Sequence, residues 1–336
     1  MLRKELVAPL KTVAPALSTL DIIPVLSCFC FDGETVTAYN DVIAISTPLA
    51  TTFRGAVQGR PLLDLLGACK AKSVEAAEAG STLNMKVGRS KFRLPMLPEE
   101  DFAYTPPEEE GESVVWSKEC YEAFKRVLVS MGEDSFYLWR SGVTVSFEGR
   151  TAVFYSTDNV TVSRHEVKLS GGSKLKGRVI TMPTQFCEIL AGFREGRLFV
   201  GSSWVGIENE AGTFVLARLV EDSRLDEYEA MFAELPEERF ALPAAFGSAL
   251  DRAAVVVDSD KATGIQVTGT AIRLKTESMV GVVRDSMKFE HDGEIRVFVM
   301  PALLRRALEL TRVALFLEDR IVFGEDGFTH IVAVVS

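Results

Sequence analysis

The sequence contains 336 residues with a formal net charge of −10, and 47% of its residues are hydrophobic. This composition excludes an intrinsically disordered chain, and the length predicts two or three domains. The acidic balance argues against a simple basic-patch binder of nucleic acid, because such a surface needs a strong excess of Lys and Arg.

The cysteines and histidines predict neither a metal site nor a cofactor. No CxxC pair occurs, and three histidines cannot complete a zinc site at the usual spacing. Buried, reduced thiols indicate a cytoplasmic protein. Lys11 and Pro15 interrupt the apolar start of the chain, so neither a signal peptide nor a membrane span is expected. The five cysteines are Cys28, Cys30, Cys69, Cys120 and Cys187.

The first third of the chain predicts two helices and a hairpin. A helix is expected over about 4–15, and 36–42 is predicted to be a strand that ends at an acidic turn. A second helix begins at Arg60-Pro61, since proline is tolerated in the first helical turn. Alternating residues in 82–87 and 91–94 predict the hairpin.

The middle third predicts the same order of elements. An amphipathic helix is expected over 117–130, with its apolar residues at helical spacing. A strand with an acidic turn follows at 153–159, and then a helix that begins at Pro183. Three short alternating segments within 197–216 predict a meander of antiparallel strands.

The last third predicts helices over 243–257 and from Pro301 onward, with a strand at 272–277 between them. The three helix-initiating prolines lie 122 and 118 residues apart, and the strand landmarks lie 117 and 119 residues apart. Two unrelated landmarks with one period indicate an internal repeat. Polar linkers at 105–112 and 235–239 mark the boundaries. We therefore predict an α+β chain of three similar domains, 1–110, 111–234 and 235–336.

Three segments carried on this repeat resemble the bacterial β-type DNA sliding clamp, the DNA polymerase III β subunit family. They are KFRLPMLPEEDF at 91–102, LVEDSRLDEY at 219–228 and RAAVV at 252–256. The resemblance covers nearly the whole chain. It implies the DNA clamp fold, in which each domain has two inner helices and outer antiparallel β-sheets. It also implies a non-enzymatic processivity factor that closes head-to-tail into a homodimeric ring around duplex DNA.

In this family the inner helices line a pore around DNA, which is contacted without regard to its sequence. The six predicted helices here are near +5, and the remainder of the chain is near −15. Encirclement needs little direct affinity, so the net acidity does not contradict it. The resemblance places the following residues at the pore: Lys4, Lys11, Lys70, Lys72, Lys118, Lys125, Arg126, Arg194, Arg252, Arg305, Arg306 and Arg312.

The family's rings close through apolar contacts between domain one of one subunit and domain three of the other. The matching positions are Phe92 and Leu94 on one side, and Val255 and Val256 on the other. A cleft between domains two and three captures short peptides from DNA polymerase and the clamp loader. Its matching positions are Trp139, Arg140, Thr157, Asn159, Val160, Thr161, Val162, Asp226, Met231, Val332, Val334 and Val335.

The chain departs from the family at this cleft. The usual Thr-Asp-Gly-His-Arg-Leu run is replaced by TDNVTV at 157–162, and the tail ends AVVS. These changes put the peptide preference in doubt and suggest a divergent or phage-encoded clamp. Two rival functions were weighed. No nucleotide-binding or hydrolase motif supports an enzyme. A monomeric clamp-like adaptor or decoy would bind replication peptides without encircling DNA, but the apolar ring positions favour a ring.

Overall fold

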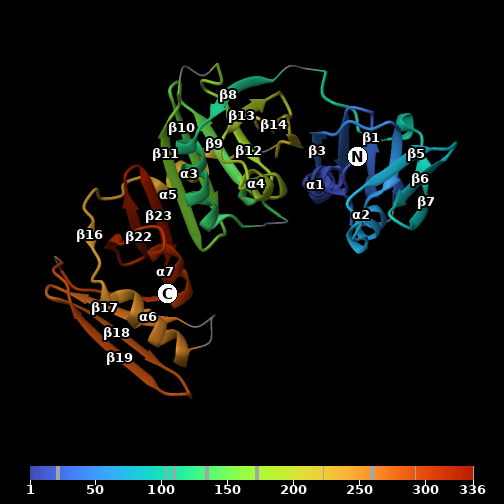
Figure 1. Ribbon diagram of the computed structural model, residues 1–336. Helices are drawn as coiled ribbons and strands as arrows, with labels where there is room; N and C mark the ends of the chain where they lie inside the picture. Colours follow the sequence, from blue (N-terminus) through green and yellow to red (C-terminus); the bar gives the residue numbers. More distant parts are fainter. Residues whose placement is uncertain are drawn as a thin grey trace. The chain divides into compact units, whose positions relative to one another are not determined.

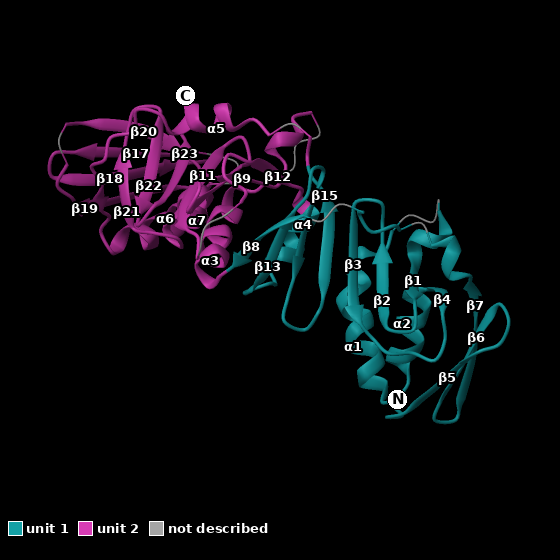
Figure 2. Cartoon of the chain, turned by 90° about the horizontal axis from the view of Figure 1, so that it is seen from above, with its two compact units in different colours: residues 1–116, 185–219 teal, residues 117–184, 220–336 magenta. Residues whose placement is uncertain are grey.

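The computed structural model describes most of the chain, and its residues form two compact units (Figures 1 and 2). Unit 1 comprises 1–116 and 185–219, and unit 2 comprises 117–184 and 220–336. The division into three domains at 110 and 234 stays a prediction. The described residues are 1–19, 23–102, 104–108, 111–132, 136–170, 174–221, 223–257, 262–291 and 293–335.

Unit 1 is built on an eleven-stranded antiparallel sheet. The strands in spatial order are β5 (Val74–Glu78), β6 (Thr82–Val87), β7 (Ser90–Leu97), β4 (Gly55–Gln58), β1 (Cys28–Phe31), β2 (Thr35–Tyr39), β3 (Ile43–Pro48), β15 (Phe214–Arg218), β14 (Trp204–Glu208), β13 (Gly196–Val200) and β8 (Glu112–Trp116). The pairing of β3 with β15 makes the sheet continuous between segments far apart in the sequence. A buried hydrogen bond of 2.8 Å between the hydroxyls of Thr47 and Thr213 supports this junction.

Two helices cover one part of this sheet. Helix α1 (Arg3–Val13) buries Leu6, Leu10 and Val13, and it packs beside helix α2 (Gly59–Ala68). The spacing of these three side chains puts them on one helical face. Helix α4 (Thr184–Leu190) begins at the boundary of the two units, and Phe186, Cys187 and Leu190 are buried.

Unit 2 contains two antiparallel sheets. The first has the order β12 (Val179–Met182), β9 (Val143–Phe147), β10 (Thr151–Thr157), β11 (Thr161–Lys168), β23 (Phe328–Ala333), β22 (Arg320–Glu325), β21 (Val313–Phe316) and β16 (Phe240–Ala241). The second has the order β19 (Val282–Lys288), β18 (Ala271–Glu277), β17 (Thr263–Thr268) and β20 (Ile295–Val299). The pairing of β11 with β23 joins the middle and last thirds of the chain.

Four helices belong to unit 2. They are α3 (Lys118–Val127), α5 (Leu225–Phe232), α6 (Ala245–Val256) and α7 (Pro301–Leu308). Helix α6 contacts α7 and one face of β18 and β19, and its Phe246 and Leu250 enter the core between the two sheets. Across the described residues, no helix is long and apolar enough to cross a membrane.

The structure confirms the elements predicted from the sequence. The six predicted helices correspond to α1, α2, α3, α4, α6 and α7, and the hairpin and the meander are present as β6–β7 and β13–β14–β15. Helix α5 was not predicted, although Leu225, Tyr228 and Phe232 have helical spacing and pack on one apolar cluster; the helix is only eight residues long.

The acidic turns occur as predicted, and a different position in each turn supplies the side chain that accepts the backbone hydrogen bonds. Asp158 accepts hydrogen bonds from the backbone N–H of Val160 and Thr161 at 3.1 and 2.6 Å. In the first turn Asn40, not Asp41, plays that part, and Asp41 takes a positive φ of 77°. The two turns therefore match as Asn-Asp and Asp-Asn, since short polar side chains suit both positions.

Candidate functional site

Unit 2 carries a hollow of about 310 Å³ beside the turn between β10 and β11. Seven of the residues predicted for the peptide cleft line it together with four others. The lining residues are Arg140, Thr157, Asn159, Val160, Thr161, Val162, Met231, Asp319, Arg320, Ile331 and Ala333. The pocket thus lies within one compact unit, where the resemblance placed the cleft.

The expected part played by the C-terminal residues needs correction. Val332 is fully buried in the core between the two sheets, and Val334 packs against that same core. Successive residues of a strand point to opposite faces, so Ile331 and Ala333 line the hollow instead. Val335 also lies outside the lining, where its N–H donates to the carbonyl of Phe298 at 2.7 Å.

Two further predicted residues, Trp139 and Asp226, lie outside the lining of the hollow. Trp139 is 5% exposed and stands edge-on to the ring of Tyr228 at 5.2 Å, in an apolar cluster with Tyr155. Asp226 is exposed and pairs with Arg224 at 3.5 Å. Only glycine fits at position 142, because a Cβ there would collide with the carbonyl oxygen of Met182. This tight passage leads from the turn that bears Trp139 into β9.

Polar groups mark two ends of the hollow. The guanidinium of Arg140 donates to the side-chain oxygen of Asn159 at 2.6 Å and lies over the Trp139 ring at 4.8 Å. Arg320 forms two hydrogen bonds to Asp319 at 2.6 and 2.9 Å. Sequence reasoning missed Asp319 and Arg320, because their part in the lining depends on the pairing of β22 with β23. The apolar centre with polar ends fits an extended or turned peptide.

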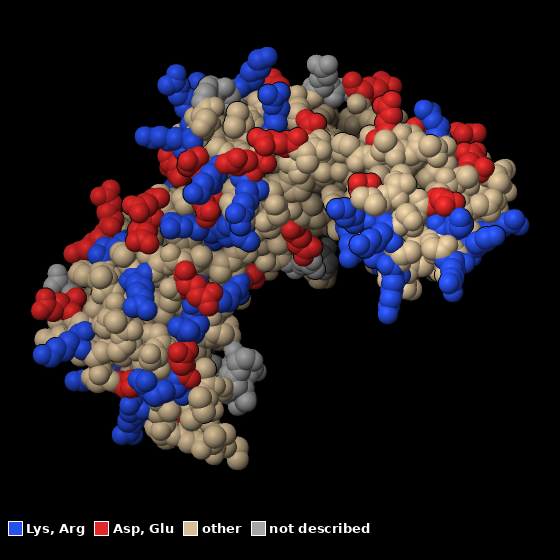
Figure 3. Space-filling view, in the orientation of Figure 1, with Lys and Arg blue, Asp and Glu red and all other residues tan. Residues whose placement is uncertain are grey.

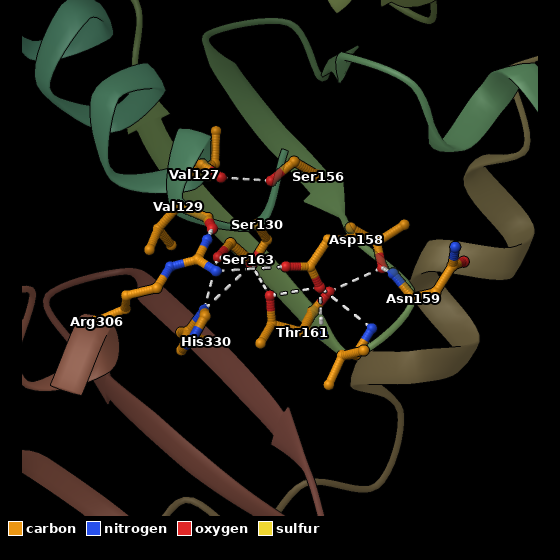
Figure 4. Close-up of polar contacts among 12 residues, drawn as sticks. Val127, Val129, Ser130, Ser156, Asp158, Asn159, Thr161, Ser163, Arg306 and His330 are labelled. Carbon is orange, nitrogen blue, oxygen red and sulfur yellow. Dashed lines mark hydrogen bonds and ion pairs between the residues drawn. The ribbon is translucent and has the colours of Figure 1, made fainter. Parts of the chain in front are cut away.

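A buried polar network lies beneath the turn that carries Asn159 (Figure 4). The hydroxyl of Thr161 donates to Ser130 at 2.9 Å, and Ser163 meets the Nδ1 atom of His330 at 2.8 Å. His330 is 1% exposed, and its Nε2 atom has no hydrogen-bond partner. Burial lowers the pKa of His330 to about 3. The imidazole is therefore neutral throughout the physiological range.

Arg306 of α7 joins this network (Figure 4). It donates to the carbonyl of Val129 and pairs with Asp158 at 3.7 Å. The same Asp158 carboxylate caps the turn between β10 and β11. Arg306 therefore ties α7 to the loop that borders the hollow, and its engagement reduces its availability to an external anion.

The predicted pore cations differ in their surroundings. Arg252 and Arg305 pair with Asp285 and Asp251 at 2.7 and 2.9 Å, and Arg126 lies 5.5 Å over the ring of Phe328. Exposed cations without an ion pair, within the described ranges, are Lys4, Lys11, Lys70, Lys72, Lys118, Lys125, Arg194 and Arg312. Basic side chains gather where α1 and α2 lie in unit 1 (Figure 3).

Four of these cations were expected on helices but lie beyond the helix ends. Lys70 and Lys72 follow α2, which ends at Ala68, because Cys69 turns to an extended backbone. Arg194 follows α4, and Arg312 follows α7. Helix periodicity sets the face of a helix better than it sets its last residue.

The predicted ring positions lie on strand β7 and at the end of helix α6, each beside an open strand edge. Phe92 and Leu94 are half-buried on β7, whose residues 90–95 pair with β6 on one side only. Strand β19 is the outermost strand of its sheet. Next to it, Val255 is 78% exposed at the end of α6.

Sequence reasoning found only part of the apolar surface near β19. Met279 and Val280 are almost entirely exposed on the turn before β19, and Val282 is 51% exposed. The hydroxyl of Ser278 donates to the carbonyl of Val256, which holds this turn against α6. We name the group the apolar tip; it consists of Val255, Val256, Met279, Val280 and Val282. Large exposed apolar patches mark interaction sites.

No protein-family model matches the sequence. Solved structures match it over its full length. A DNA polymerase III subunit beta from Pseudomonas aeruginosa is 15% identical, with a TM-score of 0.87 over 100% of this chain and 98% of that one. A putative beta subunit from Eubacterium rectale is 18% identical, with a TM-score of 0.87 over 99% and 97%. A Helicobacter pylori beta clamp bound to a DNA ligase peptide is 15% identical, with a TM-score of 0.85 over 99% and 98%. The chain has the fold of these bacterial sliding clamps.

Proposed function

We propose that this protein is a DNA sliding clamp, a non-enzymatic processivity factor that tethers replication proteins to duplex DNA. The single observation that carries the proposal is the match of the complete chain to clamp structures. Within the described residues no group of His, Cys, Asp or Glu is arranged to hold a metal ion. Among the described residues the five cysteines form no disulfide bond, and we place the protein in the cytoplasm as part of this proposal.

Two chains would close the ring head-to-tail. The open edge of β7 on one subunit would extend the sheet of the partner beyond β19, so that unpaired backbone groups on both edges gain hydrogen bonds. Phe92 and Leu94 would then cover the apolar tip. This head-to-tail joint is heterologous, and the same contact between β7 and the β19 edge forms at both joints of the ring.

Exposed lysines on the helices would face the DNA. Lys4 and Lys11 lie seven residues apart on α1, and Lys118 and Lys125 repeat that spacing on α3, so each pair shares a helical face. Such cations attract phosphates without reading bases. The ring would therefore slide on duplex of any sequence.

The hollow in unit 2 would bind short peptides of DNA polymerase, the clamp loader and other replication proteins. Its apolar wall and the polar groups of Arg140 and Arg320 support this role. The peptide preference should differ from that of other clamps, because Asn159 and Val160 occupy the turn at its edge.

The apolar tip supplies the direct test of self-association. We expect wild type to sediment at twice the mass of one chain, and Val255→Asp with Val256→Asp to sediment as a monomer, because two buried carboxylates would lack partners. Val42→Asp is the matched control, since Val42 is 46% exposed on a turn of unit 1 outside the proposed joint. A double variant that keeps the wild-type mass would contradict the proposed joint.

A further inference from the structure

The four-stranded sheet of unit 2 has one covered face and one open face. Ile265, Ile272, Leu274 and Val297 point into the core between the sheets, and α6 packs on that side. Burial alternates strictly along β17 and β18, so every second residue points to solvent. The open face lies opposite the helix and is separate from the residues that line the peptide hollow.

The open face is strongly basic in a chain whose net charge is −10. Its exposed cations come from β18, β19 and β20, of which β20 is separated from β18 by β17; they are Arg273, Lys275, Arg284, Lys288 and Arg296. Two carboxylates oppose them: Glu277, which pairs with Lys275 at 2.8 Å on the surface, and Glu294 directly before β20, which accepts a hydrogen bond from Gln266 on this face. Within the described part of the chain, Arg273, Arg284 and Lys288 make no ion pair.

A hollow of about 400 Å³ lies in the middle of this face. Gly264 forms its floor, because it contributes no side chain between Lys275 and Phe298, its neighbours on β18 and β20. Phe298 is 43% exposed, which is unusual for a phenylalanine on a strand, and Arg296 lies 5.5 Å over its ring. Arg273 completes the rim.

We propose that this face binds single-stranded nucleic acid. Cations on the adjacent strands β18 and β19, roughly 5 Å apart, would track the phosphates, and a base would stack on the exposed part of the Phe298 ring, which packs against Gly264. An antiparallel sheet that combines exposed aromatic and basic side chains is suited to unstacked bases. The bases of a duplex are stacked on one another and cannot stack on Phe298. An acidic peptide would pair with the cations but would make no specific contact with the exposed ring. The site would hold a single strand near the clamp without passing it through the ring.

The test measures binding of a labelled oligothymidine of about 16 nucleotides by fluorescence anisotropy across a salt series. For Arg273→Glu, Lys275→Glu and Arg296→Glu together, we expect at least a tenfold loss of affinity. The slope of log affinity against log salt should fall by about 2, since each phosphate contact contributes about 0.7. Phe298→Ala should lose about tenfold while the slope stays unchanged, because stacking releases no counterions.

One charge-matched control and one comparison variant separate this site from the rest of the surface. Reversal of Arg150, Lys168 and Lys176, which are exposed elsewhere in unit 2, should leave oligothymidine binding unchanged. Reversal of Lys4, Lys11, Lys118 and Lys125 tests the proposed pore and should weaken duplex binding instead. Thermal melting verifies that each variant is folded.

Several results would overturn the proposal. Wild type that fails to bind oligothymidine at low salt, or a triple variant that binds as wild type, would remove the site. Loss of oligothymidine binding in the α1 and α3 variant alone would place the strand elsewhere. In a further contrary result, polyglutamate would displace the oligonucleotide at an equal concentration of negative charge while Phe298→Ala binds oligothymidine with wild-type affinity. That result would show that the face binds an acidic protein segment instead.

Discussion

His330 makes the stability of unit 2 depend on pH. Its ring is buried among Ser130, Ser163 and the Arg306 guanidinium, and desolvation by burial is the main reason that its pKa falls to about 3. His165 is also buried, and its pKa is lowered to about 4. Both imidazoles are neutral in the folded chain at pH 5, whereas both would bind a proton in the unfolded chain.

The pH dependence of stability follows from these directions. Stability is complete above the unfolded pKa of about 6.5 and is lost as the pH falls toward the folded values. We expect each histidine to cost unit 2 about 2 kcal/mol at pH 5 relative to pH 7.5. Urea unfolding of wild type and His330→Gln at both pH values measures this. An equal acid loss in the variant would contradict the assignment to His330.

The residues of the polar network could be predicted only in part. The acidic turn at Asp158 was visible in the sequence, because Asp and Asn favour such turns. Its pairing with Arg306 was not, since the two residues lie far apart in the chain and meet only through the β11–β23 pairing. The pore position of Arg306 stays a prediction, and its side chain is 45% exposed beside Asp158.

At the scale of elements, strand β23 shows where sequence reasoning reached its limit. The run from Ile331 to Val335 is apolar throughout, so it predicts a strand but not which residues face which side. Both faces are covered, since Ile331 and Val332 are 6% and 0% exposed. Which residues of β23 face the hollow and which face the core is therefore known only from its register with β11 and β22.

The alternation of residues along β23 predicts which substitutions affect peptide binding in the hollow. We expect Ala333→Glu to weaken binding of a clamp-binding peptide from a replicative polymerase at least tenfold, because Ala333 lines the hollow and is exposed. Val335→Glu is the control, since Val335 is 48% exposed but lies outside the lining. Fluorescence titration measures both. Equal affinities for the two variants would place the peptide elsewhere.

Strand edges and helix ends were predicted unevenly. The β7 edge was found through Phe92 and Leu94, but most of the apolar tip was missed, because Met279 and Val280 lie on a turn with no periodic signal. The helices were located well by their prolines and apolar spacing. Their last residues were not, which put Lys70 and Arg312 on helices that end earlier.

At the scale of the whole molecule, the fold was predictable because the repeat recurs with one period in unrelated landmarks. The sequence is only 14 to 18% identical to clamp structures, but the period is internal to this chain and can be read without that similarity. The alternation of apolar and polar residues that builds the repeat tolerates many substitutions, whereas cleft chemistry does not. The ring and the DNA path stay predictions that rest on exposed residues.

The basic helices predict how duplex DNA is held. We expect reversal of Lys4, Lys11, Lys118 and Lys125 to glutamate to weaken nonspecific duplex binding. The salt slope should fall by about one for each lysine that contacts a phosphate. The variant with Arg150, Lys168 and Lys176 reversed is the control. A slope equal to that of wild type would show that α1 and α3 do not face DNA.

The central claim is that two chains form a closed ring, and direct imaging tests it best. Electron microscopy of the purified wild-type protein at micromolar concentration should give class averages of a six-lobed ring with a central hole. The variant with Val255→Asp and Val256→Asp should lose the ring under the same conditions. Wild-type averages that contain only single chains without a hole would contradict the account and would favour a monomeric adaptor that binds replication peptides.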